Sequence, residues 1–437
     1  MDRRDFLATA GAGLAASLLP RAAHAAERQP NIVLMLSDDV GLGQLGCYGG
    51  AFATPHLDQL ATGGIRFDRC YSTPLCGPTR CQLLTGRYPF RTGLITNQSH
   101  TAVSPEREKM IPTVLKAAGY ATASVGKWGQ ICLGPREWGF DEHLVFKGSG
   151  RFWASQSPAY DVNGRERELG EREYLPDVMH DFAVDFVRRH RDRPFFLYYP
   201  LSHMHGPILP TPESRPNADP RQLYADNVVY MDKLVGKLVA ELERLGLRGN
   251  TLVLFTGDNG TAHFDPGLVL GKPLSGKKGS MLEGGARVPL LANWPGTTPA
   301  GRVCDDLVDC SDFFATTAQL AGARLPAGVT LDSQSFAAQI KGAAGQPREW
   351  VYVELGGRSY VADKRWKLTN AGQLYDLSKA PFEELPVAAD SKDPAAVAAR
   401  ARLQAVLATH PAKPVDAGTA AAVGQRRKAR QGKNKQA

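Results

Sequence analysis

Short apolar runs alternate with helix-like patterns of apolar and polar residues from Asn31 onward. The run Ile32–Ser37 (IVLMLS) is apolar at nearly every position, which is typical of a strand buried on both faces of a sheet. The segment Thr54–Thr62 predicts a helix, with Thr54 as the N-cap and Pro55 at the first helical position. This alternation indicates an α/β fold in which helices cover a central sheet.

The same periodicity predicts the other main elements of the sheet. In open α/β sheets the active site lies at the carboxyl ends of the strands, so polar clusters directly after these runs are candidates for chemistry. We expect strands at Ile65–Tyr71, Tyr120–Val125, Phe195–Tyr199, Thr251–Thr256 and Val288–Trp294, and helices at Thr113–Ala118, Tyr174–His190 and Arg221–Leu245.

The composition of the chain changes near Ala343–Pro347. Short β-like runs separated by glycine and charged residues follow, and they predict a small antiparallel sheet with a helix after it. The runs are Trp350–Glu354, Ser359–Ala362 and Trp366–Thr369, and the helix is expected around Pro394–Ala408. We therefore expect a catalytic domain at 27–345, a C-terminal subdomain at 346–410 and a disordered basic tail at 411–437.

The N-terminus carries the three parts of an export signal, expected over residues 1–25. The segment Asp2–Leu7 (DRRDFL) resembles a twin-arginine motif, an apolar run extends to Leu19, and Ala23–Ala25 is a small-residue cleavage pattern. The apolar run is too short to span a bilayer, and no other segment suits a membrane helix. The alternative is an ordinary disordered terminus. We expect a bacterial periplasmic or secreted protein that the twin-arginine translocation machinery exports in folded form, without stable membrane insertion.

The net charge of +8 on 437 residues raises the question of a nucleic-acid partner. The charge is concentrated near the ends of the chain, so the body between them is close to neutral and no nucleic-acid partner is expected. Six positive charges lie in the tail, at Arg426, Arg427, Lys428, Arg430, Lys433 and Lys435.

The seven cysteines form no CxxC pair, which argues against a zinc ribbon or a thioredoxin-like motif. An oxidising compartment permits disulfides without requiring them. Cys304 and Cys310 are the nearest plausible partners for each other, and two buried thiols are the alternative.

Two pairs of oxygen-bearing side chains follow predicted strands. Asp38 and Asp39 come directly after IVLMLS, and Asp258 and Asn259 follow TLVLFT. Four oxygen donors at the ends of two strands suit a hard divalent cation, Ca²⁺ or Mg²⁺. Either pair alone fits a turn better than a metal site, since Asp and Asn are common turn formers. Their like placement in one sheet favours the metal site.

The segment Leu75–Arg87 (LCGPTRCQLLTGR) contains the most specific motif of the chain. It resembles the signature of the type I, formylglycine-dependent sulfatases, in which the cysteine of C-x-P-[S/T]-R is oxidised to formylglycine (3-oxoalanine) and L-T-G-R completes the modification signal. Each residue taken singly also fits a buried cysteine, a helix-starting proline or a surface arginine, but the ensemble does not. The resemblance implies that a formylglycine-generating enzyme modifies Cys76.

This arylsulfatase-like family belongs to the alkaline-phosphatase superfamily. The resemblance implies a large central mixed, mostly parallel sheet flanked by helices, and hydrolysis of a carbohydrate or aryl sulfate monoester. In hydrated formylglycine one hydroxyl attacks sulfur and the other later expels sulfate. Pro78 near a helix start would place residue 76 at the positive end of the helix dipole, and Arg80 would share its helical face.

The resemblance also assigns substrate contacts. Lys127 lies in Gly-Lys-Trp-Gly and would contact the sulfate, although a lysine after a strand is usually a solvated charge. His205 lies in His-Gly-Pro and would contact the sulfate or leaving group, with His203 the less functional neighbour. Lys278, favoured over Lys277, would be the acid for the leaving group.

The implied metal ligands are Asp38, Asp39, Cys76, Asp258 and Asn259, with Ca²⁺ preferred and Mg²⁺ possible. The similarity extends from about residue 29 to about 387, where Leu374–Leu377 (LYDL), Glu383 and Glu384 resemble the C-terminal strand and turn of the family.

Gly129 departs from the family, which often has histidine after Lys-Trp. That histidine is thought to accept the proton of the second hydroxyl during sulfate elimination, so the step has no assigned base here. We expect Gln130, or a water held by it, to substitute.

Two other functions compete with the sulfatase hypothesis. Sulfate and phosphate are both tetrahedral, so a phosphate or phosphonate ester hydrolase of the same superfamily is one alternative. A binder of sulfated glycans that has lost turnover is the other, supported only by Gly129. The expected substrate-facing loops, 97–107, 147–172 and 210–220, do not identify the sulfated molecule. Within them, Arg151, Phe152 and Trp153 either pack on a sugar or form a surface cluster without a ligand.

Overall fold

The computed structural model describes residues 29–412 apart from 100–102, 147, 157–158 and 264–266. Its centre is a ten-stranded mixed sheet. Four successive pairings in its middle, β8–β1, β1–β7, β7–β3 and β3–β4, are parallel, whereas β11 runs antiparallel to both of its neighbours. In spatial order the strands are β12 (Arg302–Asp309), β2 (Ile65–Tyr71), β11 (Arg287–Asn293), β8 (Thr251–Gly257), β1 (Asn31–Ser37), β7 (Phe195–Leu201), β3 (Ala121–Lys127), β4 (Glu142–Phe146), β5 (Tyr160–Val162) and β6 (Arg165–Arg167).

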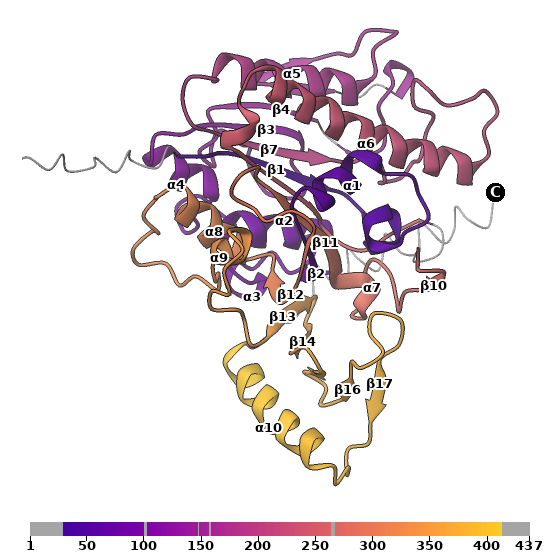
Figure 1. The fold of residues 1–437 in the computed structure, drawn as a ribbon, viewed down its shortest axis with the longest axis vertical. Helices are drawn as coiled ribbons and strands as arrows, with labels where there is room; N and C mark the ends of the chain where they lie inside the picture. Colours follow the sequence, from indigo (N-terminus) through magenta and orange to yellow (C-terminus); the bar gives the residue numbers. More distant parts are fainter. Residues whose placement is uncertain (1–28, 100–102, 147, 157–158, 264–266, 413–437) are drawn as a thin grey trace, which may run out of the picture.

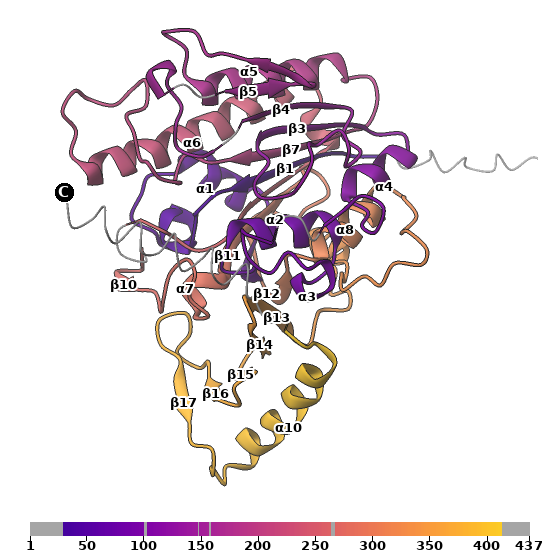
Figure 2. The same ribbon diagram turned by 180° about the vertical axis from the view of Figure 1, so that it is seen from behind.

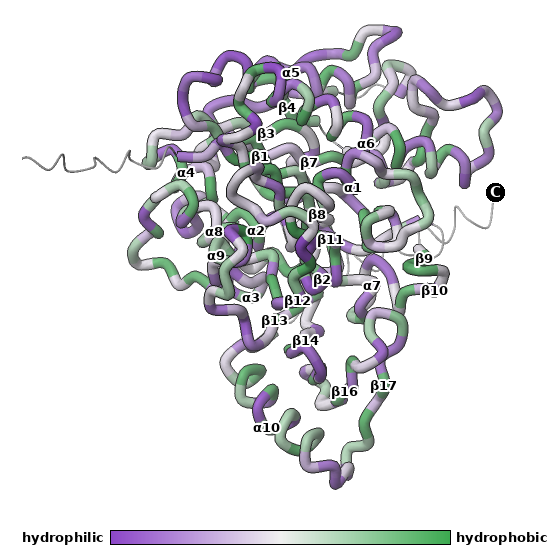
Figure 3. Tube along the Cα trace, in the orientation of Figure 1, coloured by the Kyte–Doolittle hydropathy of each residue, from purple (hydrophilic) through white to green (hydrophobic). Residues whose placement is uncertain are grey.

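Helices cover both faces of this sheet (Figure 1). The side chains of β1 alternate between two cores, with Val33 and Met35 in one and Ile32 and Leu34 in the other, which explains why the run is apolar throughout. Hydrophobic segments accordingly run through the middle strands (Figure 3). The first core is closed by α1 (Pro55–Thr62), α5 (Leu175–Arg189) and α6 (Pro220–Arg244), and the second by α2 (Cys76–Thr85), α4 (Ile111–Ala117), α8 (Asp312–Leu320) and α9 (Ala337–Ile340).

A second, five-stranded antiparallel sheet and a helix form the narrow end of the molecule (Figure 2). One face of this sheet packs against α10 through Leu403 and Leu407 and against Tyr88 and Phe90 of the main body. The predicted small C-terminal sheet and helix are thus confirmed. The elements are β13 (Val351–Leu355), β14 (Arg358–Ala362), β15 (Trp366–Thr369), β16 (Leu374–Asp376), β17 (Leu385–Val387) and α10 (Pro394–Thr409).

Several predicted elements need correction. The strand expected at Tyr120–Val125 continues to Lys127, so this lysine ends β3 instead of following it. The edge strand β12 was not predicted, because its exposed positions and its Asp305-Asp306 pair hide the apolar pattern. Thr54 is the residue before α1, but its hydroxyl accepts the N–H of Gly46 instead of capping the helix.

The ligand hypothesis for the aromatic pair at 152–153 finds no support. Phe152 is buried against Tyr174, and the ring of Trp153 packs at a tilt against Tyr174 with ring centroids 4.8 Å apart. The Trp153 indole N–H donates to the carbonyl of Pro210 at 2.8 Å. Both rings therefore contribute to packing between loops.

The remaining expectations concern the ends of the chain and the cysteines. No helix in the described ranges has the length and apolar character needed to cross a bilayer. The predicted export signal lies outside the described residues, as does the basic tail from 413 on. Cys304 and Cys310 are buried free thiols, as the second of the two sequence interpretations predicts.

Candidate active site

The two predicted acidic pairs meet at the carboxyl ends of β1 and β8. Ser37 pairs with Gly257 in the parallel ladder, so Asp38 and Asp258 leave neighbouring strands at the same level. The backbone N–H of Asp39 donates to Asp258 Oδ1 at 3.1 Å, and Asn259 Nδ2 donates to Asp39 Oδ1 at 2.7 Å. All four side chains are buried. The sheet topology thus assembles the set that the sequence predicts.

The oxygen atoms of this set suit a divalent cation. Asp38 Oδ1, Asp39 Oδ2 and Asn259 Oδ1 are buried and accept no hydrogen bond. Unpaired buried oxygens of this kind are costly, and Ca²⁺ and Mg²⁺ bind such oxygens. One potential ligand atom each from Asp38, Cys76 and Asp258 lies within 4.8 Å of the others. The donors are hard and carry enough negative charge, so the residues fit one Ca²⁺ or Mg²⁺.

The charges around these carboxylates are strongly coupled. Burial raises the pKa of Asp258 to about 7, and the neighbouring Asp38 adds to the rise. Burial also opposes ionisation of Asp38, but Lys127 and Arg80 outweigh it and hold the pKa of Asp38 well below its usual value. Two adjacent buried carboxylates therefore repel each other, and a bound cation would favour the ionised form of both.

Cys76 is the first residue of α2, and Leu75 precedes it in extended conformation. This confirms that Pro78 lies near a helix start and that residue 76 lies at the positive end of the helix, where an anion is favoured. Arg80 is fully buried, and its Nη2 donates to Asp258 Oδ2 at 2.8 Å while Nη1 donates to the Lys127 carbonyl at 2.7 Å. Arg80 thus links α2 to the residue that follows β8 and to the last residue of β3.

Lys127 and Lys278 point their ammonium groups toward the acidic pair. Lys127 is buried, forms an ion pair with Asp38 and lies with Nζ 3.9 Å from Cys76 Sγ, so the solvated-charge alternative is wrong. Lys278 forms an ion pair with Asp39, which contributes to raising the pKa of Lys278 above its usual value although burial lowers it. Lys277 is exposed. The structure therefore brings Lys278, and not Lys277, to the site.

His205 borders the same cavity as Cys76 and Lys127. Burial lowers the pKa of His205, and its Nδ1 lies 2.9 Å from the carbonyl of Gly206. His203 is more deeply buried and packs near the rings of Phe152 and Tyr230. The two histidines thus differ as the sequence suggests, because only His205 faces the cavity.

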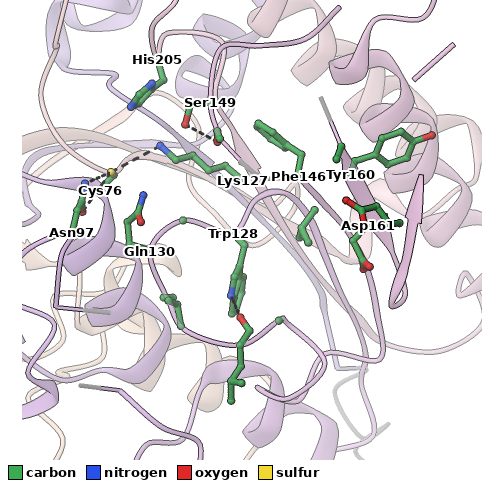
Figure 4. Close-up of a pocket in the computed structure, with 18 residues that line it drawn as sticks. Cys76, Asn97, Lys127, Trp128, Gln130, Phe146, Ser149, Tyr160, Asp161 and His205 are labelled. Carbon is green, nitrogen blue, oxygen red and sulfur yellow. Dashed lines mark hydrogen bonds between the residues drawn. The ribbon is translucent and has the colours of Figure 1, made fainter. Parts of the chain in front are cut away.

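A cavity of about 670 Å³ opens in front of Cys76 (Figure 4). Its wall includes Phe146, Tyr160 and Asp161. The carboxylate of Asp161 forms a hydrogen bond with His143 Nε2 at 2.5 Å. Of the three loops expected to face a substrate, 97–107 and 147–172 contribute lining residues, and the described lining includes none from 210–220. A cavity of this size is typical of a small-molecule or monosaccharide site.

Gly129 lies in this wall in a left-handed conformation, with φ of +92°. A Cβ atom there would come 2.9 Å from Arg80 Cδ, closer than real Cβ contacts. The backbone conformation at residue 129 therefore favours glycine over the histidine that the family often has there. A histidine at this position would need both a strained φ and a shift of Arg80. Gln130 also lines the cavity, but none of the described hydrogen bonds links it to Cys76.

The C-terminal sheet supports the segment that carries Lys278. Glu384 accepts the backbone N–H of Glu283 at 2.8 Å at the start of the short helix α7 (Glu283–Ala286). Glu283 in turn pairs with Arg287 at 3.2 Å. Glu383 is exposed and pairs only with the nearby Lys379 among its described ion-pair partners. The C-terminal motif therefore has a structural role at a distance from the cavity.

Comparison with known proteins agrees with this geometry. Residues 30–323 match the sulfatase family model. The chain is 36% identical to N-acetylgalactosamine-6-sulfatase of Canis lupus familiaris, over 75% of the chain and 68% of the relative. It is also 36% identical to arylsulfatase A of Homo sapiens, over 80% and 73%. The alignments with the N-acetylgalactosamine-6-sulfatases span about two thirds of the length of those relatives, 65% for the human one.

Among solved structures, Ps i-CgsB in complex with k-i-k-neocarrahexaose superimposes with a TM-score of 0.76 at 28% identity, covering 87% of this chain and 92% of that one. The chain belongs to the sulfatase family, whose members are sulfuric ester hydrolases.

Proposed function

We propose that this protein hydrolyses a sulfate monoester, with formylglycine made from Cys76 as the nucleophile beside one Ca²⁺. The observation that carries the proposal is the set of orphaned buried oxygens on Asp38, Asp39 and Asn259 next to residue 76 at the start of α2. The names of two relatives, a hexosamine sulfatase and a protein bound to an oligosaccharide, favour a sulfated carbohydrate as substrate.

The residues of the site have distinct roles in this proposal. Lys127 and His205 bind the sulfate oxygens at the base of the cavity, while Arg80 fixes Asp258 and the end of β3. Asp38, Asp39, Asp258, Asn259 and residue 76 would hold the cation, which supplies positive charge that favours ionisation of the nucleophile and neutralises sulfate. Lys278 protonates the leaving oxygen.

The burial of the nucleophile bears on when it is modified. Cys76 is 1% exposed in the folded chain, so a modifying enzyme must reach it before folding is complete. A twin-arginine signal at residues 1–25 carries folded protein, so we propose that formylglycine forms in the cytoplasm before export to the periplasm or medium. We also propose 27–345 as the catalytic domain and 346–410 as its supporting subdomain.

The proposed function is tested by a panel of assays on matured protein with aryl, monosaccharide and polysaccharide sulfates and with the matching phosphate esters. We expect kcat/KM for sulfates to exceed that for phosphates. A preference for phosphate esters together with stoichiometric bound zinc would instead support the phosphatase alternative. Binding of sulfated sugars without release of sulfate would support the binder.

Lys278→Ala should lower kcat/KM for sugar sulfates by about 10²–10⁴-fold, because an alkoxide leaving group needs a proton. The loss should be much smaller for an aryl sulfate with an acidic phenol, whose leaving group departs without protonation. The matched control is Lys277→Ala, since Lys277 is exposed next to it. Equal losses on both substrates would show that Lys278 only balances the charge of Asp39.

A further inference from the structure

Asn97 lies against the nucleophile in a position that the roles above leave unused. Its Nδ2 is 3.4 Å from Cys76 Sγ, whereas its Oδ1 is 3.9 Å away (Figure 4). Cys76 Sγ marks the direction in which the hydroxyls of formylglycine hydrate extend from Cβ. The side chain of Asn97 therefore touches the group that reacts.

The orientation of this amide is fixed by the backbone. The N–H of Gly77 donates to Asn97 Oδ1 at 3.0 Å, and this hydrogen bond turns Nδ2, the amide atom nearer to Cys76 Sγ, toward residue 76. Asn97 thus presents its hydrogen-bond donor closer to the nucleophile than its acceptor oxygen, at 3.4 Å against 3.9 Å. A donor of this kind cannot be a base, but it stabilises negative charge on an oxygen.

Gly77 makes this approach possible. A Cβ at residue 77 would come 2.5 Å from Asn97 Oδ1 and 3.0 Å from Gln130 Cβ. Gly77 lies inside the first turn of α2, where glycine is a poor helix former. The absence of a side chain there lets Asn97 reach residue 76.

We propose that Asn97 donates a hydrogen bond to the second hydroxyl of formylglycine hydrate and so promotes sulfate release, the step for which Gly129 offers no side chain. The inference rests on the proposed function. In this step the second hydroxyl gives its proton to water, its oxygen forms the C=O bond, and the C–O bond to sulfate breaks with the electron pair leaving on sulfate. Nδ2 stabilises the charge on the second oxygen while that proton departs.

The test separates the two chemical steps with an aryl sulfate. Each variant is first checked for the aldehyde at residue 76 by peptide mass, because its absence in the wild type would refute the proposed function and not the role of Asn97. Rapid quenching then measures release of the phenol, sulfate assay measures the second step, and the mass of the intact protein measures covalently bound sulfate.

We expect Asn97→Ala to slow sulfate release by about 10²-fold while the phenol burst changes little, so that sulfate accumulates on the protein. Gly77→Ala should act in the same way, because it displaces the amide without removing it. Asn97→Asp keeps an acceptor for the Gly77 N–H but loses the donor, and it should also retain sulfate. Gln130→Ala should slow sulfate release by less than about 10-fold, compared with about 10²-fold for Asn97→Ala.

Three results would overturn the proposal. Release at the wild-type rate in Asn97→Ala would show that the donor has no role. Equal slowing of both steps would make Asn97 a support for the shape of the site only. Wild-type or faster release in Asn97→Asp would show that the step needs an acceptor at this position.

Discussion

Replacing Cys76 by alanine is expected to lower the turnover of sulfate esters by roughly 10⁴–10⁶-fold, the range typical of losing a nucleophile. The fold should persist, because Cys76 is a buried first residue of α2 and alanine is a good helix former. Cys76→Ser should show the same loss unless the host oxidises serine at this position. The measurements are kcat on an aryl sulfate and the thermal unfolding midpoint.

The matched control is Cys81→Ala. Cys81 lies in the same helix and is equally buried, but it packs in the core behind α2. Its loss should reduce stability modestly and leave turnover near the wild-type value. Activity that survives in Cys76→Ala, or is lost to the same degree in both variants, would contradict the role assigned to residue 76.

Asp258→Asn is expected to remove the bound cation and lower turnover by at least about 10²–10³-fold. Asp258 is a proposed ligand and also the partner of the fully buried Arg80. Loss of its charge leaves that guanidinium without its closest counter-ion, and breaking a buried pair typically costs about 3–5 kcal/mol of stability. We therefore expect a lower unfolding midpoint for Asp258→Asn as well, and millimolar Ca²⁺ should raise the midpoint of the wild type but not that of the variant.

Elemental analysis and calorimetric titration with Ca²⁺ check this prediction. Asp305→Asn is the control, because Asp305 belongs to an acidic pair on the edge strand β12 and bonds Arg69 away from the site. The control should keep both metal and activity. Stoichiometric Ca²⁺ and full turnover in Asp258→Asn would remove Asp258 from the metal site.

Much of the fold was predictable because the central strands are buried on both faces and read as continuous apolar runs. The acidic pairs were predictable too, since polar residues after parallel strands collect at one edge of the sheet. Edge elements were not: β12 begins with mostly exposed positions and is buried only toward its end, and β4 contains Glu142 and His143 among its apolar residues. Their burial depends on neighbours that the local sequence does not encode.

In the site, too, residues of one continuous motif were predictable, whereas contacts between residues far apart in the sequence were not. Cys76 and Arg80 were found because one contiguous motif, LCGPTRCQLLTGR, carries both. Asn97 was missed because a lone asparagine in a loop has no periodicity, and only the folded chain brings it to Gly77. The reason for Gly129 was equally hidden, since its left-handed φ and its contact with Arg80 arise from tertiary structure.

The central claim is that residue 76 acts as formylglycine, and one measurement tests it most directly. Protein from a host with a maturation enzyme is digested, and the peptide that contains residue 76 is analysed by mass spectrometry and by reaction with a hydrazide probe. We expect an aldehyde or its hydrate at residue 76. Across preparations, kcat should rise in proportion to the fraction of chains that carry this modification. Fully active protein that carries an intact Cys76 thiol would contradict it.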